Sequence, residues 1–244
     1  MNAKDVKQKL KSLASPDVAK SSVRFFKTGP GEYGEGDIFI GIKVPTLRTV
    51  SREFRSLPLE EVETLLNSPI HEERHLALMI LVLQVAKCDD AYRRVVFDFY
   101  IQNTKFINNW DLVDCSAPHV IGGFLMDKSR KPLFQLTKSK SLWERRIAIV
   151  STQYFIRHDD FGETLAICEK LLNDKEDLIH KATGWMLREV GKKAQVVLEA
   201  FLDQHGAVMP RTMLRYAIEK FPSERRRAYL ERKRTSNEEA SDDL

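Results

Sequence analysis

The chain has 244 residues, of which 43% are apolar and 30% are charged, so it can bury a large core and is not a disordered protein. The formal net charge is +4, but residues 235–244 hold four carboxylates and no base, which leaves +8 on the first 234 residues. A basic body favours a polyanionic partner. No signal segment opens the chain, and the apolar run at 76–86 is too short to span a bilayer. We therefore expect a cytoplasmic protein without a membrane partner, and a disordered acidic tail at 235–244.

Near the N-terminus, the helical pattern that begins at Val6 is interrupted by a glycine cluster at 29–37 and by alternating residues at 37–44. A lone strand is not stable, so we interpret 37–44 as an ordered loop that leads into a helix over 45–55. No Gly-Lys-Ser/Thr follows the glycines, so the cluster is not a phosphate-binding loop. We interpret it as a folded connector.

Helical periodicity continues from there to Leu230, with short connections. Pro118 lies inside one of these segments and is expected to kink it or to split it in two. The three cysteines are isolated and predict reduced core residues. The predicted helices after the loop cover 59–67, 71–87, 90–103, 110–126, 141–157, 162–173, 177–193, 194–205 and 210–221.

One column of residues recurs at steps of 35, 36, 35 and 34 residues, namely His75, Trp110, Arg146, Lys181 and Arg215. A period near 35 is typical of a solenoid of antiparallel helix pairs. We therefore predict one repeat domain over residues 1–234. Equivalent positions of successive repeats align on one face, so the column predicts a cationic and aromatic stripe with nucleic acid as the first candidate partner.

Residues 71–75 spell H-E-x-x-H, which in zinc proteases supplies two metal ligands and a general base. That site needs a third protein ligand. The usual histidine extension does not follow, and no glutamate occurs between Glu73 and Glu144. We interpret 71–75 as a solvated helix N-terminus, with acidic residues near the positive end of the helix dipole, and expect neither a metal nor another cofactor.

Trp110 and Asp114 are four residues apart and share one helix face, whereas Asp111 is expected to point elsewhere and to supply charge to the first turn. One repeat later, Arg146 takes the position of Trp110. A further repeat later, Trp185 corresponds to the level of Asp114. Each residue alone has an ordinary structural explanation, as core filler, helix cap or ion-pair partner. As a set in the repeat register, they predict a functional patch.

Four segments carry a family resemblance: FIGIKVPTLR (39–48), WDLVD (110–114), WERRIAI (143–149) and HKATGWMLRE (180–189). With these segments in consistent order between Phe25 and Phe221, the chain resembles the AlkD family of DNA alkylation-repair glycosylases. The resemblance implies an all-α, right-handed solenoid of HEAT-like antiparallel helix pairs with a concave DNA-binding face. It also implies a monomer that acts on double-stranded DNA containing alkylated purines.

The resemblance assigns Asp114 as the catalytic carboxylate, Trp110 and Trp185 as the aromatic residues that cradle the damaged nucleotide, and Arg146 as a phosphate contact. Further DNA contacts are expected from the basic residues Lys181, Arg188 and Arg215. The implied activity is monofunctional: hydrolysis of the N-glycosidic bond of cationic N3- and N7-alkylpurines, such as 3-methyladenine and 7-methylguanine, without base flipping. The chain departs from the family in its longer glycine-rich loop at 28–37 and at Asn109, where the known enzymes can have another aromatic residue.

Three other functions are compatible with parts of the sequence. A non-catalytic binder of damaged or branched DNA would use the same scaffold, but the joint presence of the tryptophans, Asp114 and Arg146 favours the enzyme. A HEAT-type protein-interaction scaffold should have a mixed or acidic concave face, which the basic column disfavours. A zinc hydrolase comes last.

Overall fold

The computed structural model describes residues 1–231, and in this range the secondary structure is helical without any strand, which confirms the all-α prediction. The predicted tail at 235–244 lies outside the described residues. The chain forms two compact units, one from Met1 to Phe124 and one that begins at Leu125. The single repeat domain and the HEAT-like pairing of helices stay predictions. None of the described helices combines the length and the apolar character that crossing a bilayer requires.

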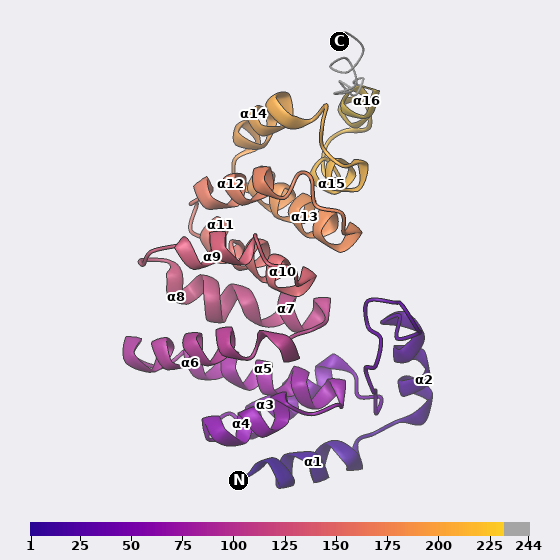
Figure 1. The fold of residues 1–244 in the computed structure, drawn as a ribbon, viewed down its shortest axis with the longest axis vertical. Helices are drawn as coiled ribbons and strands as arrows, with labels where there is room; N and C mark the ends of the chain where they lie inside the picture. Colours follow the sequence, from indigo (N-terminus) through magenta and orange to yellow (C-terminus); the bar gives the residue numbers. More distant parts are fainter. Residues whose placement is uncertain (232–244) are drawn as a thin grey trace, which may run out of the picture. The chain divides into compact units, whose positions relative to one another are not determined.

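Unit 1 is organised around helix α5, and every residue of this helix from His71 to Leu81 is buried. Helices α3, α4 and α7 pack against it, and α6 and the η2 turn also contact it (Figure 1). The elements of unit 1 are α1 (Ala3–Ser12), α2 (Pro16–Phe25), α3 (Val44–Glu53), α4 (Leu59–Leu66), α5 (His71–Val85), α6 (Asp90–Gln102), η1 (Thr104–Phe106), α7 (Trp110–Ala117) and η2 (Pro118–Gly122), after which α8 (Gly123–Leu125) leads into unit 2.

Pro118 splits the predicted helix 110–126, as expected. Helix α7 ends at Ala117, and a single π-helical turn, η2, follows from Pro118 to Gly122. Proline has no backbone N–H and its ring collides with the carbonyl four residues earlier, so a regular α-helical hydrogen bond cannot form there.

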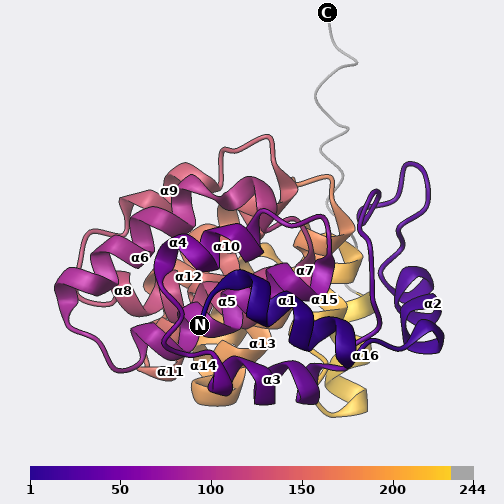
Figure 2. The same ribbon diagram turned by 90° about the horizontal axis from the view of Figure 1, so that it is seen from below.

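The segment at 37–44 is the predicted ordered loop, with one isolated bridge between Ile38 and Ile70. At Gly41 the backbone has φ +83°, and a β-carbon added there would lie 2.0 Å from the carbonyl oxygen of Ser15. Only glycine allows this close approach of the loop to the start of α2. Figure 2 shows α2 at the edge of unit 1, and no residue of this helix is buried.

Unit 2 is organised around α13, which packs against α10, α11, α12, α14 and α15. Residue Gly184 lets α15 approach, because a β-carbon there would lie 2.4 Å from the carbonyl oxygen of Met213. The predicted helix 141–157 is two helices that meet at Thr152, and the predicted helix 210–221 ends early, at Ala217. The elements of unit 2 are α9 (Lys131–Leu136), α10 (Leu142–Ser151), α11 (Gln153–Arg157), α12 (Gly162–Lys170), α13 (Asp177–Lys193), α14 (Gln195–His205), α15 (Arg211–Ala217) and α16 (Ser223–Glu231).

Candidate functional site

The start of α7 is fixed by a fully buried residue, Asn109. Its side-chain oxygen accepts a hydrogen bond of 2.8 Å from the backbone N–H of Trp110. Its side-chain nitrogen donates to Asp37 over 3.1 Å. The helix that carries Trp110 and Asp114 is therefore anchored to Asp37, where the glycine cluster ends and the loop at 37–44 begins.

Trp110 is half-buried and packs against two phenylalanines that were not among the predicted site residues. Its ring stacks on Phe26 at 5.4 Å with an interplanar angle of 21°, and meets Phe25 edge-on at 5.9 Å. The side chain of Phe25 is 64% exposed, which is unusual for a large apolar residue. The adjacent phenylalanine pair at the end of α2 was the signal that could have identified this aromatic cluster.

Asp114 lies one helical turn after Trp110 on α7 and is half-buried. Residues four apart are neighbours on one helix face, as the sequence predicted for this pair. The indole and the carboxylate are thus presented by one short, anchored helix.

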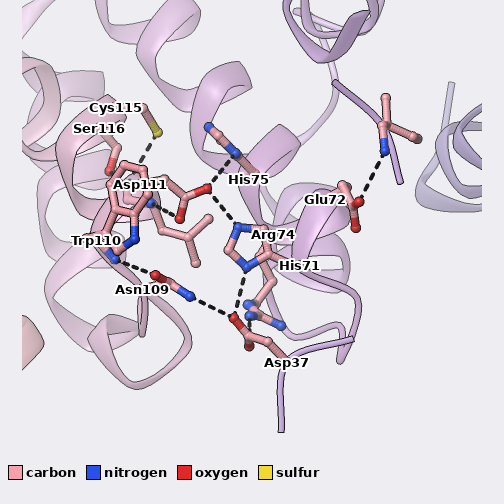
Figure 3. A network of polar contacts seen from close by, with 12 residues as sticks. Asp37, His71, Glu72, Arg74, His75, Asn109, Trp110, Asp111, Cys115 and Ser116 are labelled. Carbon is pink, nitrogen blue, oxygen red and sulfur yellow. Dashed lines mark hydrogen bonds and ion pairs between the residues drawn. The ribbon is translucent and has the colours of Figure 1, made fainter. Parts of the chain in front are cut away.

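Asp111 does more than supply charge to the first turn of α7. One carboxylate oxygen accepts the backbone N–H of Leu112 over 2.9 Å, which is the expected role. The other oxygen lies 2.8 Å from Nε2 of His71 and 3.3 Å from Nδ1 of His75 (Figure 3). Asp111 therefore links α7 to α5, a contact that was not predicted from the sequence.

The start of α5 is buried, so its interpretation as a solvated helix N-terminus was wrong. His71 is 2% exposed and His75 is 4% exposed. Burial disfavours the charged imidazole, but hydrogen bonds and charge from Asp111 and Asp37 outweigh it and raise the pKa of His71 to about 9. For His75, burial is likewise outweighed, by Cys115 and Asp111, which raise its pKa to about 10. The two imidazolium groups in turn hold the pKa of Asp111 far below its usual range, although burial opposes this.

Asp37 holds the other side of His71. Its carboxylate lies 2.9 Å from Nδ1 of His71 and also pairs with Arg74, one of whose terminal nitrogens donates to the carbonyl of Ser68 over 3.0 Å. Burial would raise the pKa of Asp37, but the hydrogen bond from His71 and the charge of Arg74 leave that pKa lowered. Asp37 was not among the predicted site residues either.

Glu72 is the residue that would be the general base of an H-E-x-x-H hydrolase, but it has a structural role. Its carboxylate accepts three backbone N–H groups of the loop, from Ile40 at 3.1 Å, Gly41 at 2.7 Å and Ile42 at 3.2 Å. In Figure 3 it points away from His71 and His75. This arrangement disfavours metalloprotease chemistry.

In unit 2, the predicted phosphate contact Arg146 is only 5% exposed, and its Nη1 donates to the carbonyl of Leu178 on α13 over 2.7 Å. Trp185 is half-buried, and its indole N–H donates to Glu189 over 3.2 Å. Both side chains are therefore held in place by α13.

The other predicted DNA contacts of unit 2 differ in exposure. Lys181 is half-buried and pairs with Asp177 over 2.8 Å, while Arg188 is held by Glu189 and Glu219. Arg215, on the adjacent α15, is exposed. The recurring column is thus only partly a surface stripe, because its members His75 and Arg146 are buried.

The structure brings the predicted residues together in two groups. Trp110 and Asp114 share α7 in unit 1. Arg146, Trp185 and the other basic residues lie on α10, α13 and α15 of unit 2, which pack side by side. The convergence of the two groups on one patch stays a prediction.

One cluster in residues 1–231 has donor atoms placed closely enough to hold a metal ion. It consists of His71, His75 and Asp111, whose donor atoms all lie within 4.8 Å of one another. The third ligand that the H-E-x-x-H segment lacked in sequence is therefore offered by an aspartate of α7.

Comparisons with known proteins agree with this architecture. A solved structure from Enterococcus faecalis, described as a predicted DNA alkylation repair enzyme, is similar with a TM-score of 0.67 and 17% sequence identity. The match covers 86% of this chain and 97% of the other, which shows a shared fold. A search of curated proteins found no match. The family model described as DNA alkylation repair enzyme matches residues 6–221, nearly the whole chain, so the protein belongs to the DNA alkylation repair enzyme family.

Proposed function

We propose that the chain is a monofunctional DNA glycosylase that hydrolyses the N-glycosidic bond of cationic N3- and N7-alkylated purines in duplex DNA. It acts as a monomer and without flipping the base. Membership of the DNA alkylation repair enzyme family suggests a role in the repair of alkylated DNA. The finer assignment rests on one observation, which is that α7 carries two carboxylates in different environments.

Asp111 is occupied by two imidazolium groups, which neutralise its charge inside unit 1. It is therefore poorly suited to stabilise another cation. Asp114 lies outside this cluster, is half-buried and shares a helix face with the indole of Trp110. Of the two carboxylates, Asp114 is the one suited to act on a substrate.

The chemistry requires one carboxylate. N-alkylation places a positive charge on the purine and weakens its bond to deoxyribose. As this bond breaks, the base takes the electron pair and leaves neutral, and the positive charge moves to the sugar as an oxocarbenium ion. Ionised Asp114 would stabilise that ion and orient the water that attacks C1′, as a carboxylate does in glycoside hydrolysis. No general acid is needed because the leaving base is already cationic.

The tryptophans and the basic residues would have separate roles. Trp110 and Trp185 would each contribute about 0.5–2 kcal/mol through cation–π contact with the developing charge. Arg146 is only 5% exposed and donates to the carbonyl of Leu178, so it would hold a backbone phosphate only if its guanidinium turned toward the DNA. Contacts with phosphates position the protein without reading the base sequence, as a repair enzyme requires.

The test is the release of free 3-methyladenine and 7-methylguanine from methylated duplex DNA by the wild type and by Asp114→Asn. We expect release by the wild type and a loss of at least ~100-fold in the variant, because the amide keeps the shape of the carboxylate but not its charge. DNA affinity, measured by fluorescence anisotropy, should be unchanged. Asp98→Asn changes a half-exposed carboxylate of α6 in the same way and is the matched control. This variant should release both bases as the wild type does.

Equal release by Asp114→Asn and the wild type would refute the assignment of Asp114. If neither protein released either base while both bound DNA tightly, the chain would instead be a non-catalytic DNA binder on the same scaffold.

A further inference from the structure

Helices α5 and α7 face each other and direct three metal-binding groups to one point (Figure 3). His71 and His75 are four residues apart on α5, so both imidazoles lie on the face that packs against α7. From α7, Asp111 places one carboxylate oxygen 2.8 Å from Nε2 of His71 and 3.3 Å from Nδ1 of His75. Ligands around a tetrahedral ion with bonds of about 2.0–2.2 Å are about 3.3–3.6 Å apart, so the His75–Asp111 distance already fits and the His71–Asp111 distance would have to lengthen by about 0.5–0.8 Å.

We propose that His71, His75 and Asp111 form a binding site for a divalent transition-metal ion of the zinc class. Imidazole nitrogen and carboxylate oxygen are ligands that Zn²⁺, Co²⁺ and Ni²⁺ accept. The site is separate from Asp114, and the proposal does not depend on the glycosylase activity.

Side chains around the cluster orient the proposed ligands through hydrogen bonds, as the residues behind the ligands of known metal sites do. Asp37 accepts a hydrogen bond from Nδ1 of His71 over 2.9 Å, which leaves Nε2 directed at Asp111. Asp37 is itself held by Arg74 and Asn109. A carboxylate that fixes the far nitrogen of a histidine is the usual support of a metal-bound imidazole, because it sets both the tautomer and the ring orientation.

The donor types in the cluster also suit a divalent ion. His71 contacts a carboxylate through each ring nitrogen, and Asp111 lies between His71 and His75. Two imidazoles and one carboxylate form a mixed nitrogen and oxygen ligand set of the kind that zinc sites use.

His75 has one nitrogen that the hydrogen-bond network does not use. Its Nε2 is buried without a hydrogen-bond partner among the described residues and points toward Cys115 in Figure 3. A buried, unsatisfied ring nitrogen is unfavourable.

The proposed site is structural. The side chains of His71, His75 and Asp111 are 2%, 5% and 11% exposed, so a bound ion would be shielded from a substrate, and a water molecule would take the fourth tetrahedral position. Glu72 is committed to backbone N–H groups and is not available as a base. A bound ion would instead fasten α5 to the start of α7, and so hold the helix that carries Trp110 and Asp114.

The experiment is a titration of the full chain, freed of metal by a chelator, with ZnCl₂ in an isothermal calorimeter. We expect one strong site per chain in the wild type. Asp111→Asn and His75→Gln should each weaken Zn²⁺ binding by at least ~10-fold, and Asp37→Asn by ~10–100-fold, as losses in the outer shell do. His158→Gln removes a surface histidine of unit 2 and is the control, with unchanged binding.

Two further measurements guard against variants that fail to fold. Wild-type Tm should rise with Zn²⁺ concentration, since an ion that binds only the folded chain stabilises it. Co²⁺ bound to the wild type should give the visible absorption of a tetrahedral site. Asp114→Asn should bind Zn²⁺ like the wild type, which separates this proposal from the glycosylase proposal. Absence of binding by the wild type, or equal binding by wild type and a folded Asp111→Asn, would overturn the metal site.

Discussion

Removing the carboxylate of Glu72 should destabilise unit 1 severely, although the residue lies in no proposed site. It is 3% exposed and accepts the backbone N–H groups of Ile40, Gly41 and Ile42. In Glu72→Ala these three groups lose their acceptor. A buried donor without a partner costs about 1–3 kcal/mol, so three would cost ~3–6 kcal/mol once water partly replaces the carboxylate. That is a large share of the ~5–15 kcal/mol by which domains are stable.

Urea denaturation followed by circular dichroism measures this loss, and amide hydrogen exchange at Ile40, Gly41 and Ile42 locates it. In the variant, these three amides should lose more protection against exchange than the amides of α5 do. Glu63→Ala, at an exposed position of α4, is the control and should change the free energy of unfolding by no more than ~0.5 kcal/mol. A loss below ~1 kcal/mol in Glu72→Ala, with the three amides still protected, would refute the structural role of this carboxylate.

Three further predictions follow from single features. Gly41→Ala places a β-carbon 2.0 Å from the carbonyl oxygen of Ser15 at φ +83°, so Tm should fall sharply, and an unchanged Tm would contradict the close approach. The pKa values of His71 and His75 are raised from 6.5 to about 9 and about 10. Their contribution to the stability of the folded protein is therefore complete below pH 6.5 and is lost as pH rises through 9 and 10. The free energy of unfolding, measured by urea denaturation across this range, should decline, and a flat profile would argue against the charged network. Arg215→Ala should weaken DNA binding for all sequences alike and lower the salt slope of log K by about 1, as measured by anisotropy at several salt concentrations; a loss confined to some sequences would count against a phosphate contact.

The helices were predictable because their signal is local. The predicted helix at 177–193 has the bounds of α13, and the predicted break at Pro118 is present, since periodicity and proline act within a few residues. The break at Thr152 was not predicted, because neither a proline nor a glycine marks it. Helix interiors were thus easier to predict than helix ends.

The buried cluster was only partly predictable. The period aligns His75 with Trp110 and so brings Asp111 near His75 in the register, but Asp111 was predicted to point away from that face, and the third donor was missed. Asp37 could not be found in this way, because it lies in an irregular loop that follows no period. For Phe25, the sequence offered only its position beside Phe26, because its exposure and its contact with Trp110 are tertiary features.

The basic face of α13 has a consequence for how a polyanion would bind. Lys181 and Arg188 already hold carboxylates, those of Asp177 and Glu219. A phosphate that arrives here must therefore exchange with a protein anion, in addition to displacing water. A phosphate contact that first has to break such an ion pair contributes less binding free energy than a phosphate contact with an unpaired cation. A ligand with a single phosphate would therefore bind weakly. A ligand that presents several phosphates in one rigid array, as duplex DNA does, could displace both carboxylates together.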